Sequence, residues 1–243
     1  MIPWLAPDQP FPPVSAALDT PNGLLAASSE LTAERLLMAY SLGIFPWYSE
    51  EEPVLWWSPD PRMVLFADEL KISRSFSRTL RRSADDAAIE IRTDSAFDAV
   101  IRACAEPRAD DAGTWITKRV ADAYSELHRR GAAHSVETWI HGTLAGGLYG
   151  VSLGRMFYGE SMFSHVPDAS KLALAALVQL LRVEQVPVID CQQNTRHLAS
   201  LGAREIPRTQ FVAHLEESVH AGPIDWANYF GRPLNALLSD LRT

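Results

Sequence analysis

The sequence is poor in residues that cross-link a chain or bind metals through sulfur. Its 243 residues include only two cysteines, Cys104 and Cys191. A disulfide framework needs several pairs, and a structural zinc site needs about four ligands at characteristic spacings. We therefore expect no metal and two reduced, buried thiols.

Long apolar runs and targeting signals are also missing. No stretch approaches the roughly 18 apolar residues that a membrane span requires. The N-terminus lacks the basic and then apolar layout of a signal peptide and reads as a proline-rich arm over residues 1–20. These absences favour a cytoplasmic protein with no membrane partner.

Basic residues are in the minority, with 22 Lys and Arg against 30 Asp and Glu and a formal charge of -8. This balance argues mildly against binding to nucleic acid through its phosphates. One segment is the exception, because it contains basic residues and no acidic one: Lys71, Arg74, Arg78, Arg81 and Arg82. Arg74, Arg78 and Arg82 recur along one face of a predicted helix. Two interpretations are open: a solvated helix face, or a surface for a phosphate-bearing partner.

Hydrophobic periodicity predicts an α+β fold without internal repeats. The expected helices span residues 32–42, 73–82, 95–105, 114–130, 172–181, 195–200 and 209–219. The expected strands span residues 63–66, 89–92, 134–140, 144–152, 155–164, 186–191 and 204–207. The strand, helix, strand unit at 155–191 predicts a parallel pair, and the tail beyond Gly222 gives no pattern. Prolines around Asp60 break regular structure, so we predict a small N-terminal domain, 1–62, and a mixed-sheet domain, 63–243.

The segment Val186–Gln193 ends an apolar run in a carboxylate, a thiol and two amides. In a regular strand Asp190 and Gln192 share one face. Side chains two apart on a strand lie roughly 7 Å from each other, which is close enough to hold one substrate group between them. The plainer interpretation of Asp190 is a solvated strand end.

Glu160 lies in the apolar segment Phe157–Phe163. By simple alternation it shares a strand face with Met156, Tyr158 and Met162. A carboxylate in such surroundings needs a partner, because an unpaired buried charge is unfavourable by several kcal/mol. The partner is either an internal arginine or the cationic end of a substrate.

Tryptophan is abundant, with seven residues where roughly three are expected. Trp47, Trp57 and Trp115 fall in proline-interrupted segments or at a helix entry. A single tryptophan in a loop most often covers the core. Several together also form stacking platforms for unpaired bases, worth about 1–3 kcal/mol per base.

The connection from strand to helix at His165–Lys171 indicates whether the protein could use CoA as a cofactor. Asp168 is predicted to cap the following helix, whose free N–H groups could face an anion. The topology resembles that of acetyltransferases that use acyl-CoA, which hold the pyrophosphate with a glycine-rich loop at this point. No glycine lies between Ser164 and Lys171, which argues against CoA.

With these stretches assembled, the chain resembles the leucyl/phenylalanyl-tRNA-protein transferases over residues 21–211. The matching segments are Pro21-Asn-Gly-Leu-Leu, Leu36-Leu-Met-Ala-Tyr, Gly43-Ile-Phe-Pro-Trp, Leu55-Trp-Trp-Ser-Pro-Asp-Pro-Arg, Gly113-Thr-Trp-Ile-Thr, His134-Ser-Val-Glu, Gly159-Glu-Ser-Met-Phe-Ser, Ala169-Ser-Lys, Ile189-Asp-Cys-Gln and Leu198-Ala-Ser-Leu-Gly-Ala. The resemblance implies a small N-terminal domain and an acetyltransferase-like (GNAT-like) mixed-sheet C-terminal domain.

The resemblance also implies a reaction. Leu or Phe, and less readily Met, would pass from aminoacyl-tRNA to proteins that begin with Arg or Lys, which marks them for N-degron proteolysis. No metal and no CoA would be needed, because the ester is already activated. We expect a monomer. The alternatives are a CoA-dependent N-acyltransferase and a non-catalytic RNA-binding module.

The resemblance assigns roles to eight residues. Trp47 and Trp115 would flank the 3'-terminal adenosine, and Leu148, Phe157 and Met162 would form the side-chain pocket. Glu160 would lie near the substrate ammonium or the cationic end of the acceptor. Asp190 and Gln192 would orient the α-amine and help to deprotonate it, and positioning would supply most of the rate.

Overall fold

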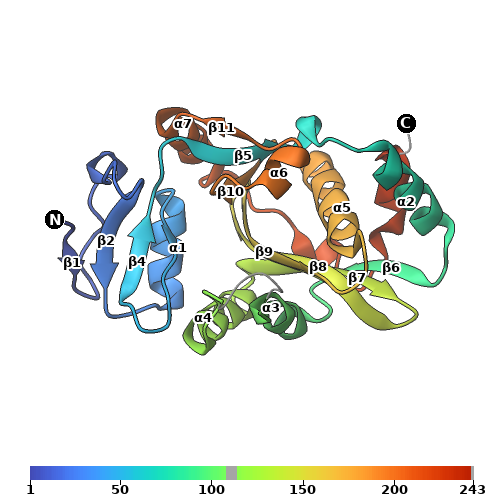
Figure 1. Cartoon of the computed structure of the whole chain (residues 1–243), viewed down its shortest axis with the longest axis horizontal. Helices are drawn as coiled ribbons and strands as arrows, with labels where there is room; N and C mark the ends of the chain where they lie inside the picture. Colours follow the sequence, from blue (N-terminus) through green and yellow to red (C-terminus); the bar gives the residue numbers. More distant parts are fainter. Residues whose placement is uncertain (108–113, 242–243) are drawn as a thin grey trace.

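A computed structural model describes residues 1–107 and 114–241. Its first part is a four-stranded sheet with the order β1-β2-β4-β3, drawn in blue shades at the left of Figure 1. The strands are β1 Trp4–Leu5, β2 Leu24–Ser28, β3 Phe45–Pro46 and β4 Val54–Trp57. The N-terminal arm is therefore partly ordered, because β1 pairs in parallel with β2.

Helix α1, Ala33–Ser41, packs beside this sheet and presents Leu36 and Tyr40 to the core. Thr32 begins the helix, and its hydroxyl accepts a hydrogen bond from the backbone N–H of Arg35 at 3.1 Å. Side-chain capping of this kind satisfies a backbone donor that the first turn leaves free. The predicted helix over residues 32–42 is confirmed.

The second sheet has seven strands in the order β11-β5-β10-β9-β8-β7-β6. These strands are β5 Arg62–Phe66, β6 Ile89–Thr93, β7 Ala133–Ile140, β8 Thr143–Leu153, β9 Met156–Ser164, β10 Val188–Gln192 and β11 Arg204–Ile206. The β9–β10 pair is parallel, and the other neighbouring pairs are antiparallel. The predicted α+β class with a mixed sheet is confirmed.

Helices cover both faces of the second sheet (Figure 1). Helices α5 and α2 lie on one face, and α3 and α4 lie on the other. The helices are α2 Arg74–Asp85, α3 Phe97–Ala105, α4 Lys118–Arg129, α5 Ala169–Val183, α6 Arg196–Ser200 and α7 Arg208–Ser218, with short 3-10 helices at Val14–Ala16, Ala67–Glu69, Trp226–Asn228 and Leu234–Leu241. Within the described ranges, none of these helices has the length and apolar character needed to cross a membrane.

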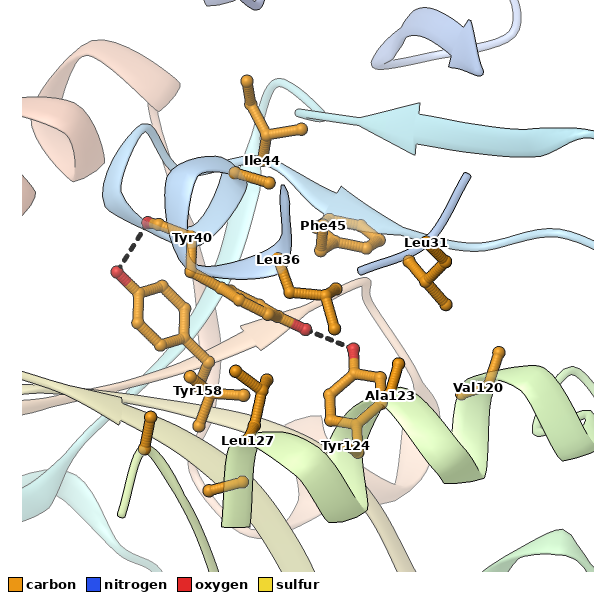
Figure 2. Close-up of a cluster of buried hydrophobic side chains, with 14 of the residues drawn as sticks. Leu31, Leu36, Tyr40, Ile44, Phe45, Val120, Ala123, Tyr124, Leu127 and Tyr158 are labelled. Atoms are coloured by element: carbon orange, nitrogen blue, oxygen red, sulfur yellow. Dashed lines mark hydrogen bonds between the residues drawn. The ribbon is translucent and has the colours of Figure 1, made fainter. Parts of the chain in front are cut away.

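One hydrophobic cluster joins residues of both sheets, and Figure 2 shows three tyrosines within it. The hydroxyl of Tyr40 from α1 lies 2.5 Å from the hydroxyl of Tyr124 from α4. Tyr158 of β9 donates to the backbone carbonyl of Tyr40 at 2.8 Å. The two sheets share a core, and the domain boundary between residues 62 and 63 stays a prediction.

Strands β9 and β10 diverge soon after they meet. Their register joins Phe157 with Ile189 and Tyr158 with Asp190. Beyond that point each strand is irregular, with a register shift in β10 between Asp190 and Gln192 and another where β9 pairs with β8. Bulges of this kind re-aim side chains, and the candidate site opens at this divergence.

The predicted start of α4 differs from the structure. Helix α4 is capped by Thr117, whose hydroxyl accepts from the backbone N–H of Val120, rather than by Thr114. The hydroxyl of Thr114 instead accepts from the backbone N–H of Ile116 at 3.1 Å. Gly113, which opens the matching sequence segment, lies outside the described residues.

Asp168 is the N-cap residue of α5, as predicted, but its side chain forms no capping hydrogen bond. Its backbone is left-handed, with φ 66°, and its carboxylate accepts from Lys171 at 2.8 Å and from Thr79 of α2 at 3.1 Å. The hydroxyl of Ser164 accepts from the backbone N–H of Ser170 at 3.3 Å. A donor at the start of α5 is therefore already satisfied within the chain.

Candidate active site

A cavity of about 720 Å³ lies where β9 and β10 diverge. Its walls come from β3, β8, β9 and β10 and from helices α3, α5 and α6. Seven of the eight residues assigned from the sequence line it: Trp47, Trp115, Leu148, Phe157, Glu160, Met162 and Gln192. Asp190 is the exception.

Glu160 is held by three hydrogen bonds at the cavity wall. Its carboxylate accepts from Tyr40 at 2.7 Å, from Tyr124 at 2.9 Å and from the side-chain amide of Gln192 at 2.8 Å. Burial raises the pKa of Glu160 to about 7, and the negative charge of Asp190 acts in the same direction, whereas the three hydrogen bonds oppose the rise. A carboxyl with this pKa can take up or release a proton near neutral pH.

A bulge in β9 sets the position of Glu160. Gly150 of β8 pairs with Gly159 and Tyr149 pairs with Ser161, so Glu160 is the extra residue between them. The predicted alternation along this strand is therefore interrupted at Glu160, and its partners are two tyrosines and an amide rather than an arginine. A Cβ at Gly150 would lie 2.3 Å from the carbonyl oxygen of Tyr158, so only glycine fits there.

Asp190 lies in a sealed interior rather than in the cavity, so the prediction that its side chain and that of Gln192 share one strand face is wrong. Its side chain is fully buried and forms two hydrogen bonds with Arg62, at 2.8 and 2.6 Å. Gln192 has a left-handed backbone, with φ 62°, and its N–H donates to Asp190 Oδ1 at 2.9 Å. This bend turns the side chain of Gln192 toward Glu160. A regular strand would have placed the two side chains side by side.

The two tryptophans occupy the rim of the cavity. Trp47 is exposed and packs edge-on against Trp57, with ring centroids 5.7 Å apart. Trp57 donates from its indole N–H to the backbone carbonyl of Trp47 at 2.7 Å, which fixes that segment. Trp115 is partly buried and precedes α4. Both indoles border the same space.

The deep end of the cavity is apolar. Leu148 and Phe157 are buried there, and Met162 is partly buried. Helix α5 adds Leu174 and Leu177 to the lining. Cys191 is only partly buried and borders this space. The expectation that both thiols are buried holds for Cys104 alone.

Residues 64–216 match the family model of the leucyl/phenylalanyl-tRNA protein transferases, and residues 29–60 match the model of that family's N-terminal domain. The chain belongs to this family. It is 61% identical over 230 residues to the leucyl/phenylalanyl-tRNA–protein transferase of Paraburkholderia xenovorans (strain LB400), covering 93% of this chain and 94% of the relative. It is 62% identical over 219 residues to that of Chromobacterium violaceum, covering 90% and 92%. The predicted assignment to a transferase family is confirmed.

Solved structures of other proteins are more distant from this transferase. A GCN5-related N-acetyltransferase from Kribbella flavida is 10% identical, with a TM-score of 0.34, and the match covers 75% of this chain and 65% of that one. L-PGS from Bacillus licheniformis is 11% identical, with a TM-score of 0.39, and the match covers 68% and 51%.

The basic segment of this transferase is solvent-exposed. Its five residues, Lys71, Arg74, Arg78, Arg81 and Arg82, all lie on the surface, on and just before α2. Phe76 and Leu80 form the buried face of the same helix. Thr79 joins α2 to Asp168 at the start of α5, and α5 lines the cavity. Helix α5 therefore lines the cavity and is joined at its start to the helix that carries the basic residues.

Three residues at the site were missed by sequence reasoning. Tyr40 and Tyr124, which donate to Glu160, and Arg62, which pairs with Asp190, received no role at the site from the sequence. No local signal identifies the Arg62–Asp190 pair, because 128 positions separate the two residues.

Proposed function

We propose that this transferase moves Leu or Phe, and less readily Met, from aminoacyl-tRNA to the α-amine of proteins with N-terminal Arg or Lys, and so marks them for N-degron proteolysis. The observation that carries the proposal is a single cavity with two indoles at its rim, an apolar end, and the Glu160–Gln192 pair in its wall. The reaction would take place in the cytoplasm on a monomeric enzyme.

The aminoacyl end of the tRNA fits this cavity by shape and polarity. Trp47 and Trp115 would stack on the terminal adenine, which gives sequence-tolerant binding of one base. Leu148, Phe157 and Met162 would bury the Leu or Phe side chain. The ester between the two would then lie near the wall that carries Glu160 and Gln192.

The chemical step exchanges an ester for an amide. The acceptor amine attacks the ester carbonyl carbon, a C–N bond forms, and the C–O bond to the ribose breaks. The amine loses one proton and the ribose oxygen gains one. Glu160, with a pKa of about 7, would carry that proton from one to the other, and the amide of Gln192 would orient the amine. Asp190 would act through Gln192 rather than on the amine directly, because it is buried.

The charges around the cavity favour a cationic acceptor. Glu106 and Glu160 line it, and its described lining includes no lysine or arginine. An acceptor with Arg or Lys at its first position brings a positive side chain next to its α-amine. Opposite charges at such distances in a partly desolvated site attract strongly, so these acceptors would be preferred over neutral ones.

The tRNA body would lie on the basic face of α2, where Lys71, Arg74, Arg78, Arg81 and Arg82 meet phosphates. CoA fits the site less well. Its pyrophosphate would need free N–H groups at the start of α5, where Ser164 accepts from Ser170 N–H and where the carboxylate of Asp168 lies. A phosphate there would be repelled.

The test is a transfer assay with radiolabelled Phe-tRNA and three peptides that begin with Arg, Lys and Ala. We expect label in the Arg and Lys peptides and little in the Ala peptide. The same assay with Leu-tRNA and Met-tRNA ranks the donors. No transfer by pure, folded protein would discard the proposal. Saturable binding of acetyl-CoA in calorimetry would favour a CoA-dependent acyltransferase, and tRNA binding without product would leave an RNA-binding module.

A further inference from the structure

Arg62, the first residue of β5, lies in a fully enclosed site. Its guanidinium donates from Nε and from a terminal nitrogen to the two oxygens of Asp190, at 2.8 and 2.6 Å. The other terminal nitrogen donates to the backbone carbonyl of Gly43 at 3.1 Å. The rings of Phe45 and Phe211 lie on the guanidinium, with centroids 4.6 to 4.7 Å away. A guanidinium that pairs with a carboxylate through two parallel hydrogen bonds is held in a single orientation.

Through Asp190, Arg62 is connected by hydrogen bonds to the wall of the cavity. Asp190 Oδ1 accepts from Arg62 Nε and also from the backbone N–H of Gln192. That second bond holds Gln192 in its left-handed conformation, from which its side chain reaches Glu160. Left-handed backbone is unfavourable for a residue with a side chain unless its surroundings maintain it. Arg62 therefore fixes the carboxylate that maintains the bend.

Through Gly43, Arg62 is also connected to the chain segment that reaches the rim of the cavity. Gly43 follows α1 with φ 74°, and its carbonyl is the acceptor for Arg62. Four residues later the chain reaches Trp47, whose backbone N–H donates to Leu55 of β4 at 3.0 Å. The segment between them forms β3. Arg62 thus contacts the start of the segment that carries the exposed indole.

We propose that Arg62 is a positioning residue of the transfer reaction, which sets the Gln192–Glu160 pair and the Trp47 segment relative to each other. The inference rests on the proposed function. It means that Asp190 serves as an anchor with its charge matched by Arg62, and that neither residue takes the proton of the amine. Fold stability alone does not require this pair, because apolar residues often replace buried ion pairs without loss of stability.

A matched control exists in the same chain. Arg35 is also buried, lies over the ring of Phe11 at 4.0 Å, and donates to the backbone carbonyls of Pro7 and Gln9. It does not line the cavity within the described residues. Lysine keeps the positive charge at either position but does not have the planar fork and its parallel bonds. Both Arg62→Lys and Arg35→Lys thus replace a buried guanidinium by an ammonium, and only Arg62→Lys removes a fork paired with a carboxylate.

The experiment measures kcat and KM for transfer of Phe from Phe-tRNA to a peptide with N-terminal Arg. We expect Arg62→Lys to lower kcat by about 30–100 fold, since small misplacements of reacting groups have effects of that order, and to weaken binding of an amide-linked phenylalanyl-adenosine analogue. Arg35→Lys should leave kcat and binding of the analogue unchanged, although its Tm should shift by an amount similar to that of Arg62→Lys. Wild-type kcat in Arg62→Lys, or an equal loss in Arg35→Lys, overturns the inference. No transfer by the wild type would overturn the proposed function as well.

The pH profile separates positioning from proton transfer. Arg62→Lys, which keeps a positive charge beside Asp190, should lower the kcat profile without moving its midpoint, because the proton passes through Glu160. A midpoint that moves in this variant would overturn the proposal. Should the single variants fail to fold, the apolar pair Arg62→Met with Asp190→Leu tests the same point. That double variant should fold and transfer poorly, and wild-type transfer by it would contradict us.

Discussion

The side-chain amide of Gln192 donates to Glu160 Oε1 at 2.8 Å, across the opening between β10 and β9. These strands are paired just before this point, at Asp190 and Tyr158. Each then departs from regular geometry, and the two departures bring an amide and a carboxyl together. This pair is the chemical centre of the proposed site, and the predictions below test its surroundings.

The pH dependence of stability should report Glu160. Its pKa in the folded protein is about 7, above its ordinary value of 4.5. Between these values the folded state binds more protons than the unfolded state, so the free energy of unfolding falls as pH rises through the interval from about 4.5 to 7. Glu160→Gln should remove this contribution. Urea unfolding at several pH values measures the free energy of unfolding of the variant and of the wild type. The difference between these two free energies should grow with pH up to about 7, and a constant difference would contradict this prediction.

The two tyrosines on Glu160 should tune its proton affinity. The hydrogen bonds from Tyr40 and Tyr124 hold the pKa of Glu160 below the value that burial alone would give. Tyr124→Phe should therefore move the midpoint of the kcat profile to higher pH. Tyr158→Phe is the control, because its hydroxyl binds the backbone of Tyr40 and not Glu160. Equal midpoints in the two variants would refute the assignment.

The basic face of α2 should control the salt dependence of tRNA binding. Neutralising Arg74, Arg78 and Arg82 should reduce the slope of log K against log salt by up to about 2–3, near 0.7–0.9 for each phosphate that the protein no longer neutralises. The matched variant neutralises three exposed residues on the opposite face of the sheet: Arg102, Lys118 and Arg129. If both triples change the slope equally, α2 is only a solvated surface.

Gly150 should be required for the bulge that carries Glu160. A Cβ there would lie 2.3 Å from the carbonyl oxygen of Tyr158 and 2.6 Å from the ring of Phe157. Gly150→Ala should lower the free energy of unfolding by roughly 2–4 kcal/mol, in the range of severe overpacking, and should reduce transfer. Gly222→Ala, which meets no atom within 4 Å, should change neither. Denaturant unfolding curves measure the change in stability, and transfer rates measure the change in activity.

Elements with a clear local pattern were predictable from the sequence. The helix that Thr32 caps, the antiparallel strands from His134 to Ser164, and the buried helix before Val186 all follow from periodicity and capping. Residues from several of the matching family segments also line one cavity. Local spacing and short motifs carry this information directly.

The chemistry of the wall was not predictable in the same way. Regular alternation placed Asp190 beside Gln192, but a register shift sends one inward and the other to the cavity. The partners of Glu160 come from α1, α4 and β10, which sequence spacing does not connect. Burial of Asp190 depends on Arg62, a contact between distant segments. These features arise from tertiary packing that overrides local rules.

The most direct test is the single-turnover rate of Phe transfer from Phe-tRNA to a peptide with N-terminal Arg, compared between the wild type and Gln192→Ala with tRNA affinity measured in parallel. We predict that the variant binds tRNA normally and transfers at least about tenfold more slowly, because an orienting group at the reacting centre contributes that much or more. An unchanged transfer rate in the variant would show that the amine meets the ester elsewhere.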